Sequence, residues 1–136
     1  MVTSSGLGER PIAGCATYSA ANASSNFMAQ ALSYELKEQN IHVMSWVAGA
    51  AATKMFHPDK RAKMRPVGPC VDAMLADLSN GELISYGSRQ QHQMNAIFGS
   101  MPNFAVNRMM FKAMCKSYHD DMERMKKEGN SMDEYL

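Results

Sequence analysis

The segment IHVMSWVA, residues Ile41–Ala48, decides the fold class of this chain. It is a compact apolar run with β-branched residues, and Asn40 and Gly49 stand on either side of it. Such a run is typical of a strand that is buried on both faces, as in a parallel sheet covered by helices. We therefore predict a buried parallel strand over Ile41–Ala48.

The residues before this strand predict a strand end, a loop and a helix. Val2 to Ser5 is interpreted as a strand end, and GLGERPIAG (residues 6–14) has the glycine and proline of a loop. A helix is predicted from Thr17 to Gln39, and Asn40 suits its end. The apolar residues that recur in it at helical spacing are Phe27, Met28, Ala31, Leu32 and Leu36.

The residues after this strand continue the alternation. Residues 49–69 lack a clear period and carry three prolines, so we predict a long loop with a helical turn in it. A short helix (residues 71–78), another strand (82–87) and two helices divided near Met101-Pro102-Asn103 are predicted to follow. This order predicts an α/β fold, the C-terminal portion of a doubly wound (Rossmann-like) parallel sheet, followed by C-terminal helices.

Composition excludes several functions. The chain has 136 residues, and its 14 basic residues against 13 acidic ones give no field that favours nucleic acid. No apolar run of about 18 residues exists, so no transmembrane segment is expected. Cys15, Cys70 and Cys115 are odd in number and far apart, which favours an intracellular, reducing compartment. The four histidines lack ligand spacing, so no metal site is predicted.

Ser5 and Tyr18 are the first residues that suggest chemistry. Ser5 ends the first predicted strand, and Tyr18 enters the next helix thirteen positions later. Both side chains then face the crevice beyond the strand ends, where ligands of such sheets bind. The pair alone is a weak signal, because Ser5 can hydrogen-bond to its own loop and Tyr18 can be a core aromatic residue with a satisfied hydroxyl.

A wider pattern resembles the second half of a short-chain dehydrogenase/reductase. It consists of VTSSGLGERPIAGCATYSAAN, LSYELKEQNIHVMSWVAG and AAATKM, and covers Val2 to Met55. In that family a strand ends in two serines, a tyrosine follows at this spacing, and a proline-glycine pair and a threonine come after the next strand. Gly49 and Thr53 match that glycine and threonine, whereas Ala48 replaces the proline.

The resemblance implies hydride transfer between NADP or NAD and a carbonyl or alcohol. It implies that Tyr18 is the proton donor, that Ser5 holds the substrate oxygen, and that Gly49 and Thr53 lie at the cofactor. A lysine four residues after the tyrosine lowers the pKa of the phenol and binds the nicotinamide ribose. Asn22 stands in that lysine position and carries no charge. It is therefore a defective catalytic and cofactor-binding position.

The cofactor cradle of the family, a strand followed by a glycine-rich turn and a helix N-terminus, has no match in this chain. We therefore expect little or no activity or cofactor binding from the chain alone. Three origins stay open: a truncated gene product, a fragmentary gene model, or a non-catalytic structural or interaction subunit derived from a dehydrogenase. A pseudoenzyme is one form of the last.

The C-terminal stretch from residue 80 to 127 resembles a narrower branch, that of 17-beta-hydroxysteroid dehydrogenase and very-long-chain 3-oxoacyl-CoA reductase. The resemblance implies a lipid-like steroid or 3-oxoacyl-CoA substrate, lipid or steroid metabolism, and association with the endoplasmic reticulum membrane. Residues 1–88 are assigned to the dehydrogenase-like half domain, 89–126 to a helical extension, and 127–136 to a loose polar tail.

Three surfaces have competing interpretations. The basic loop around Lys60 and Arg65 either contacts CoA phosphates or is simply solvated, and solvation is favoured. The apolar stripe from Phe111 to Met125 covers a substrate, lies on a membrane, or packs on a partner that completes the sheet. The helix from Thr17 to Gln39 resembles the one that family members use for dimers, so a homodimer is expected.

Overall fold

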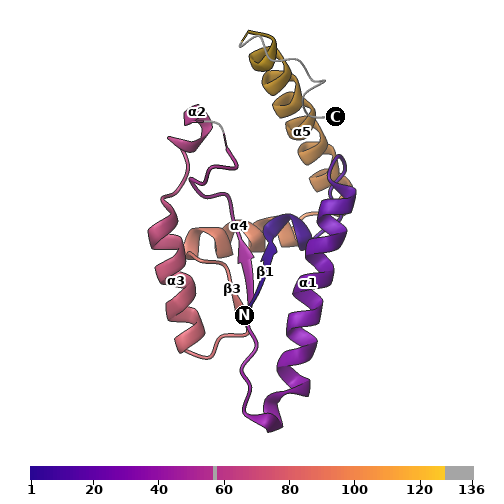
Figure 1. Ribbon diagram of the computed structural model, residues 1–136. Helices are drawn as coiled ribbons and strands as arrows, with labels where there is room; N and C mark the ends of the chain where they lie inside the picture. Colours follow the sequence, from indigo (N-terminus) through magenta and orange to yellow (C-terminus); the bar gives the residue numbers. More distant parts are fainter. Residues whose placement is uncertain (57, 128–136) are drawn as a thin grey trace.

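The computed structural model describes residues 1–56 and 58–127. Its sheet has three parallel strands in the order β1 (Val2–Ser5), β2 (Ser45–Ala48) and β3 (Ile84–Ser85). Ser5 pairs with Ala48, and Trp46 pairs with Ser85. All three carboxyl ends therefore lie at one edge of the sheet (Figure 1). This parallel α/β architecture with C-terminal helices confirms the predicted fold class.

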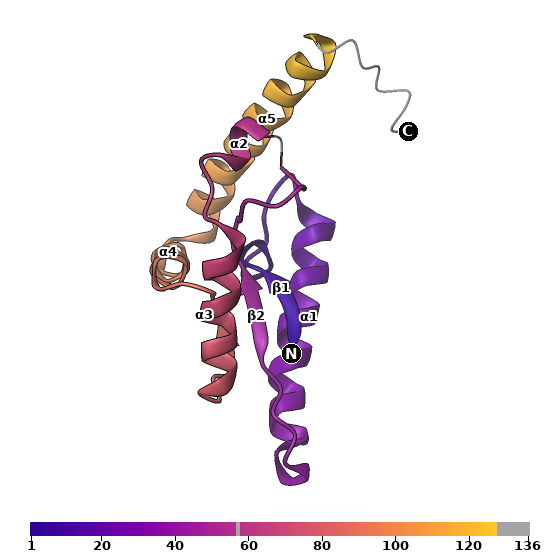
Figure 2. The same cartoon turned by 60° about the vertical axis from the view of Figure 1, so that its left-hand side comes forward.

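Two crossover helices, α1 (Ala16–Glu35) and α3 (Val67–Ser79), connect the strands. They cover opposite faces of the sheet, which lies between them in Figure 2. Because parallel strands need a crossover connection, this arrangement explains why each strand is separated from the next by a helix. Two short 3-10 helices flank α1: η1 (Gly6–Gly8) precedes it and η2 (Lys37–Gln39) follows it.

The remaining helices lie near the carboxyl ends of the strands. A single turn, α2 (Pro58–Arg61), interrupts the long loop after β2. Helix α4 (Arg89–Ser100) runs across the strand direction at the height of the strand ends, and α5 (Asn103–Lys127) extends beyond that edge (Figure 1). The predicted division of the C-terminal region near Met101–Asn103 and the helical turn in the loop are both confirmed.

The core of the described residues is small and partly polar. Met44 and Val47 are fully buried, and so are the small polar residues Ser45 and Ser85. Ser85 Oγ donates to Asp77 Oδ2 of α3 at 2.6 Å, which satisfies a hydroxyl in the sheet interior. The strands thus attach to their helices by hydrogen bonds as well as by apolar packing.

Several predicted boundaries are wrong. The strand expected over Ile41–Ala48 begins only at Ser45, because β1 offers four residues to pair with, and Ile41 is 48% exposed. The strand expected over residues 82–87 is reduced to Ile84–Ser85, the two residues that pair with β2. The helix expected to reach Gln39 ends at Glu35 and continues as η2, which Asn40 caps at φ 60°.

Three further predictions concern the start of α3, the C-terminal tail and the absence of a transmembrane segment. Helix α3 starts at Val67 rather than Val71, directly after Pro66. The loose tail predicted over residues 127–136 falls outside the described residues, apart from Lys127, which ends α5. Within residues 1–56 and 58–127, no helix combines the length and the apolar character needed to cross a membrane.

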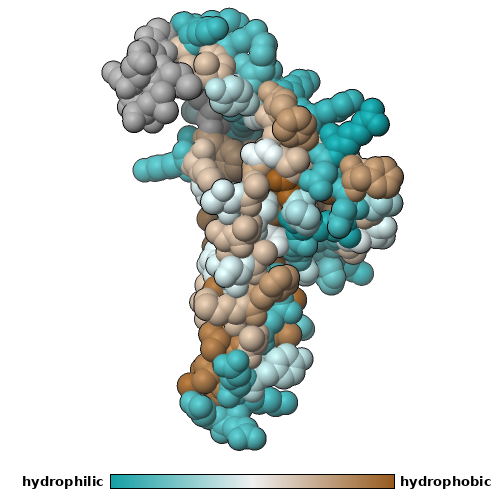
Figure 3. Space-filling view, turned by 90° about the vertical axis from the view of Figure 1, so that its right-hand side faces the viewer, coloured by the Kyte–Doolittle hydropathy of each residue, from teal (hydrophilic) through white to brown (hydrophobic). Residues whose placement is uncertain are grey.

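The outer face of α1 carries exposed apolar side chains (Figure 3). Phe27 is 65% exposed, Met28 52% and Tyr34 73%. This helix is the one assigned to self-association from the sequence, and the exposed face leaves that prediction open to a direct test.

Candidate functional site

A cavity of about 1140 Å³ lies at the carboxyl ends of the strands. Its walls come from the segments that follow β1, β2 and β3, from the first turns of α1, and from α4 and α5. The cavity brings together all five residues predicted from the sequence: Ser5, Tyr18, Asn22, Gly49 and Thr53. The crevice beyond the strand ends is where open α/β sheets bind ligands.

Ser5 is half-buried at the end of β1 and lines this cavity. Its Oγ accepts a hydrogen bond from the Leu7 N–H at 3.3 Å, so the hydroxyl also caps η1. The neighbouring Ser4 is 3% exposed and donates to the Asn22 carbonyl of α1 at 2.8 Å. Because a hydroxyl both donates and accepts, Ser5 keeps its proton available for a ligand while it caps the turn.

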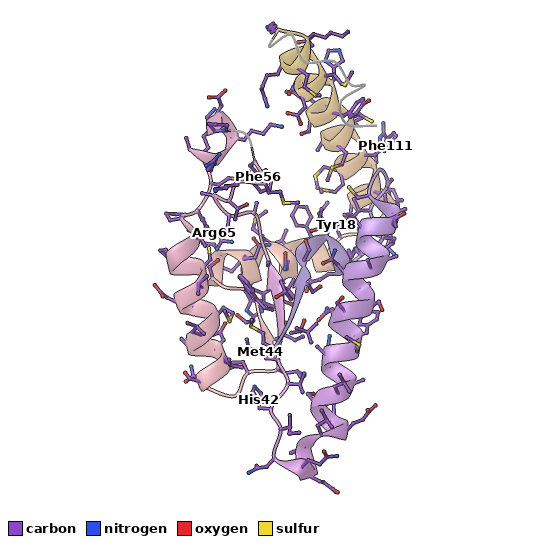
Figure 4. The ribbon with its side chains drawn as sticks, viewed as in Figure 1. Tyr18, His42, Met44, Phe56, Arg65 and Phe111 are labelled. Carbon is purple, nitrogen blue, oxygen red and sulfur yellow. The ribbon has the colours of Figure 1, made fainter. Side chains whose placement is uncertain are left out.

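Tyr18 lies in the first turn of α1 and is 45% exposed, so it is not an aromatic side chain buried in the core. It extends from α1 into the space beyond the strand ends, and Phe56 comes from the facing loop (Figure 4). Within residues 1–56 and 58–127 its hydroxyl makes no hydrogen bond to the protein. The phenol is therefore open to a ligand in the cavity.

Asn22 lies one turn after Tyr18, but its side chain is hydrogen-bonded to the helix backbone. Its Nδ2 donates to the Tyr18 backbone carbonyl at 2.9 Å. A Cβ on Gly8 would lie 2.6 Å from the Asn22 Cβ, so the turn after β1 presses directly on α1 at this point. The side-chain oxygen of Asn22 remains as an acceptor, and its amide nitrogen is engaged within the helix.

No lysine of the described residues lines the cavity. Its two cationic side chains are arginines with hydrogen bonds of their own. Arg10 donates to the carbonyls of Met101 (2.6 Å) and Gly99 and to Asn103 Oδ1. Neither Lys37 nor Lys54 reaches the cavity, so neither takes the place of the lysine that Asn22 replaces.

Gly49 follows β2 and is closely covered by other side chains. A Cβ there would lie 2.7 Å from Gln91 Cδ and 2.9 Å from Arg65 Nη2. Arg65 in turn donates to Ser88 Oγ and, at 3.4 Å, to Gln91 Oε1. A larger residue at 49 would displace the ends of the Gln91 and Arg65 side chains from the strand end.

Thr53 is exposed in the loop after β2 and lines the cavity. The loop is held back on itself, since the Ala52 N–H donates to the Arg65 carbonyl at 2.8 Å. Met55 and Phe56 follow Thr53 in this loop and line the same cavity as Met110 and Met114 of α5. The part of the cavity remote from the strand ends is therefore apolar and rich in methionine, which adapts to irregular ligand shapes.

Glu9, Tyr86 and His92 are among the cavity residues that the sequence analysis missed. The Tyr86 hydroxyl donates to Glu9 Oε1 at 2.7 Å, and its ring stacks on that of His92 with centroids 5.0 Å apart. Burial, together with the hydrogen bond and the charge of Glu9, raises the pKa of Tyr86 well above its ordinary value. Glu9 and Tyr86 each follow closely on a strand end, which is the sequence signal that points to them.

One family model matches the first part of the chain. Residues 1–64 match the family described as short chain dehydrogenase. This matched region contains Ser5, Tyr18, Asn22, Gly49 and Thr53. No curated protein matches the chain.

Solved structures show the same fold. A short-chain dehydrogenase from Sphingobium yanoikuyae in complex with NADPH is 22% identical, with a TM-score of 0.55 over 74% of this chain and 44% of that one. The bulky-bulky ketone specific alcohol dehydrogenase from Comamonas testosteroni is 21% identical, with a TM-score of 0.53 over 74% of this chain and 41% of that one. The chain thus spans less than half the length of either protein.

The match over residues 1–64 is to the family that the sequence resembles, and the two solved structures share the fold of this chain. Neither comparison reaches the narrower steroid and 3-oxoacyl-CoA branch. The roles of the individual cavity residues likewise remain predictions.

Proposed function

We propose that the cavity is the substrate side of a short-chain dehydrogenase-type oxidoreductase site that interconverts a carbonyl and an alcohol. The observation that carries this proposal is the meeting of Ser5, Tyr18 and Thr53 in one cavity at the strand ends. These residues come from three different segments, and their common location is what a site for one ligand requires.

The residues present fit the nicotinamide end of an NADP or NAD cofactor in part. The Tyr18 hydroxyl has no protein partner among the described residues, Thr53 is exposed at the cavity, and Asn22 keeps its side-chain oxygen. These three side chains, with Gly49 beside them, would hold that end. The cofactor supplies the hydride when it is bound. The described residues contain no glycine-rich turn opening directly into a helix, so they offer no cradle for its pyrophosphate.

Within this site Ser5 and Tyr18 both act on the substrate oxygen, in different roles. The Ser5 hydroxyl donates a hydrogen bond to the carbonyl oxygen and so fixes its position. The Tyr18 hydroxyl gives its proton to the same oxygen as negative charge develops there. Because general acid assistance is worth about 10²–10⁴ in rate, the neutral Asn22 leaves the chain with low activity.

The substrate we propose is a bulky apolar ketone of the steroid or 3-oxoacyl-CoA type. The apolar wall of Phe56, Met110 and Met114 supports this class, since it can adapt to a large hydrocarbon body. The bulky-bulky ketone specific alcohol dehydrogenase from Comamonas testosteroni shares the fold.

The test combines binding and turnover on the purified chain. We expect NADPH to bind weakly in calorimetry and benzophenone, a bulky ketone, to be reduced slowly, with Tyr18→Phe removing the reduction. Ser24→Ala, on the exposed face of α1, is the matched control and should leave the rate unchanged. Absence of binding by both NADPH and the ketone would overturn the proposal.

A second candidate is a non-catalytic interaction subunit that keeps the fold. The engagement of the Asn22 amide by the Tyr18 carbonyl favours it, because this geometry makes the lysine position part of the helix rather than of the site. Restoring the charge by Asn22→Lys separates the candidates: gained turnover supports a weakened enzyme, and none supports the interaction subunit.

A further inference from the structure

Glu9 provides the only carboxylate among the described residues that line the cavity. It closes the η1 turn, where its backbone N–H donates to the Gly6 carbonyl at 3.3 Å. Its side chain reaches across to the end of β3, where Oε1 accepts the Tyr86 hydroxyl. The carboxylate is thus fixed in place at the wall, by two segments that are distant in the sequence.

The charge of Glu9 is not neutralised within residues 1–56 and 58–127. No lysine, arginine or histidine of those ranges forms an ion pair with it. The adjacent Arg10 directs its guanidinium to backbone carbonyls near the end of α4, and Arg65 directs its own to Ser88 and Gln91. A half-buried carboxylate without a cation is costly unless other donors satisfy it.

Tyr86 satisfies only part of the acceptor capacity of Glu9. An ionised carboxylate has about four lone-pair sites, and the Tyr86 hydroxyl occupies one of them. Stacking on His92 holds the Tyr86 ring, which in turn fixes the orientation of the carboxylate. The second oxygen of Glu9, Oε2, accepts no hydrogen bond from the protein within the described ranges.

We propose that Glu9 is a specificity-determining residue that accepts a hydrogen bond from an N–H or O–H donor on the ligand. The cavity then selects amphipathic compounds in which an apolar body lies against Met110 and Met114 and an ammonium or hydroxyl group reaches Glu9. Carboxylates of the same shape are rejected, because like charges at a shared site repel. The inference rests on the proposed function only in taking the cavity as the substrate space.

The test uses three probes with one apolar body: 1-adamantanamine, 1-adamantanol and adamantane-1-carboxylate. Binding to the full chain is measured by ligand-observed nuclear magnetic resonance (NMR) without any cofactor. We expect the ammonium and the alcohol to bind at least tenfold more tightly than the carboxylate. In Glu9→Gln the advantage of the ammonium over the carboxylate should fall at least tenfold, while the alcohol changes less than threefold.

Two further variants keep the result interpretable. Glu35→Gln removes an exposed carboxylate at the end of α1, away from the cavity, and should leave all three affinities unchanged. Tyr86→Phe removes the bond that orients Glu9, and should reduce the discrimination between probes without abolishing binding. Circular dichroism shows whether each variant is folded.

The outcomes separate this inference from the proposed function. Equal binding of the three probes, or a Glu9→Gln profile identical to that of the unaltered chain, overturns the role of Glu9 and leaves the oxidoreductase proposal standing. No binding by any probe also overturns the role of Glu9, whereas the oxidoreductase proposal is overturned only when neither NADPH nor the ketone binds. Discrimination by Glu9 together with failure to bind NADPH supports this inference and counts against the oxidoreductase.

Discussion

The side-chain amide of Asn22 donates to the backbone carbonyl of Tyr18 at 2.9 Å, one turn earlier on α1. Both residues line the same cavity, yet the bond joins Asn22 to the helix backbone and not to the Tyr18 phenol. Asparagine at this position therefore stabilises the start of the helix locally and adds no charge to the site.

Asn22→Lys is expected to increase ketone reduction by the chain. A lysine side chain placed one turn from Tyr18 faces the same cavity and supplies the missing positive charge. If the oxidoreductase proposal holds, NADPH-dependent reduction should rise at least tenfold, as measured by loss of absorbance at 340 nm. Ser24→Lys puts the same charge on an exposed part of α1 and serves as the control. An equal gain in both variants would show that the charge acts without reference to Tyr18.

Gly8→Ala is expected to destabilise the fold, because its new Cβ meets backbone. The Cβ would lie 2.7 Å from the Asn22 carbonyl carbon and 2.8 Å from the Ala23 nitrogen. Overpacking of this kind lowers the free energy of unfolding by about 1–3 kcal/mol. Gly68→Ala is the matched control, since a Cβ there meets nothing within 4 Å and lies inside α3.

Urea unfolding followed by circular dichroism measures both glycine variants. Gly68→Ala should raise the free energy of unfolding by about 0.4–1 kcal/mol, because alanine restricts the unfolded chain. A Gly8→Ala variant as stable as the unaltered chain would mean that η1 and α1 do not pack as described.

The sequence predicted the location of the candidate residues better than it predicted the strands that carry them. Ser5, Gly49 and Thr53 follow strand ends, and parallel strands bring such positions to one edge whatever their exact length. Strand length itself depends on the neighbour. The apolar character of Ile41 to Met44 predicted a strand there, but the residues that pair with β1 begin only at Ser45.

The bond between Glu9 and Tyr86 could not be predicted from local patterns. The two residues are 77 positions apart, and no periodicity or motif links them. Their contact depends on how far the η1 turn carries Glu9 toward β3, which is a property of the folded loop. The hydrogen bond between Arg10 and Asn103, which are 93 positions apart, could not be predicted from local patterns either.

Lys60→Ala is expected to loosen α2 from α5. Lys60 Nζ donates to both oxygens of Asp121, at 2.8 and 3.0 Å, and to Ser117 Oγ at 3.0 Å. Because both side chains are partly exposed, the global stability should change by less than about 1 kcal/mol. Faster amide hydrogen exchange at Ala62 and Met64, whose N–H groups donate to the Pro58 and Arg61 carbonyls, should report the local opening, and Lys63→Ala, on the exposed part of the same loop, should not cause it.

This link is also expected to respond to acid. The hydrogen bond from Lys60, with the charges of Lys60 and Arg124, lowers the pKa of Asp121 below its ordinary value of 3.8. The stabilisation from the contact between Lys60 and Asp121 is therefore fully present above pH 3.8. It is lost as the pH falls through the lowered pKa that Asp121 has in the folded state. Carboxyl NMR titration should show the Asp121 pKa moving up in Lys60→Ala. An unchanged Asp121 titration would contradict the contact.

Tyr86 is expected to resist ionisation at alkaline pH. Burial and the neighbouring Glu9 raise its pKa above the ordinary value of 10.0, so its contribution to stability is present below pH 10 and is lost as the pH rises through the raised value. Absorbance at 295 nm, compared between the unaltered chain and Tyr86→Phe, isolates its titration. Glu9→Gln should lower the Tyr86 pKa, and Glu35→Gln should not.

The hydrogen bonds that join the loop after β1 to α5 and to the end of α4 have a consequence for the order of folding. Ala13 bonds to Asn107 and Arg10 to Met101, over separations of 94 and 91 residues. Contacts of such high contact order form slowly, because a long loop must close before they contribute. On the ribosome α1 can pack on β1 and β2 early, whereas the cavity is completed only after α5 has emerged. Proteases that act during synthesis would therefore meet an open site long before the finished chain encloses it.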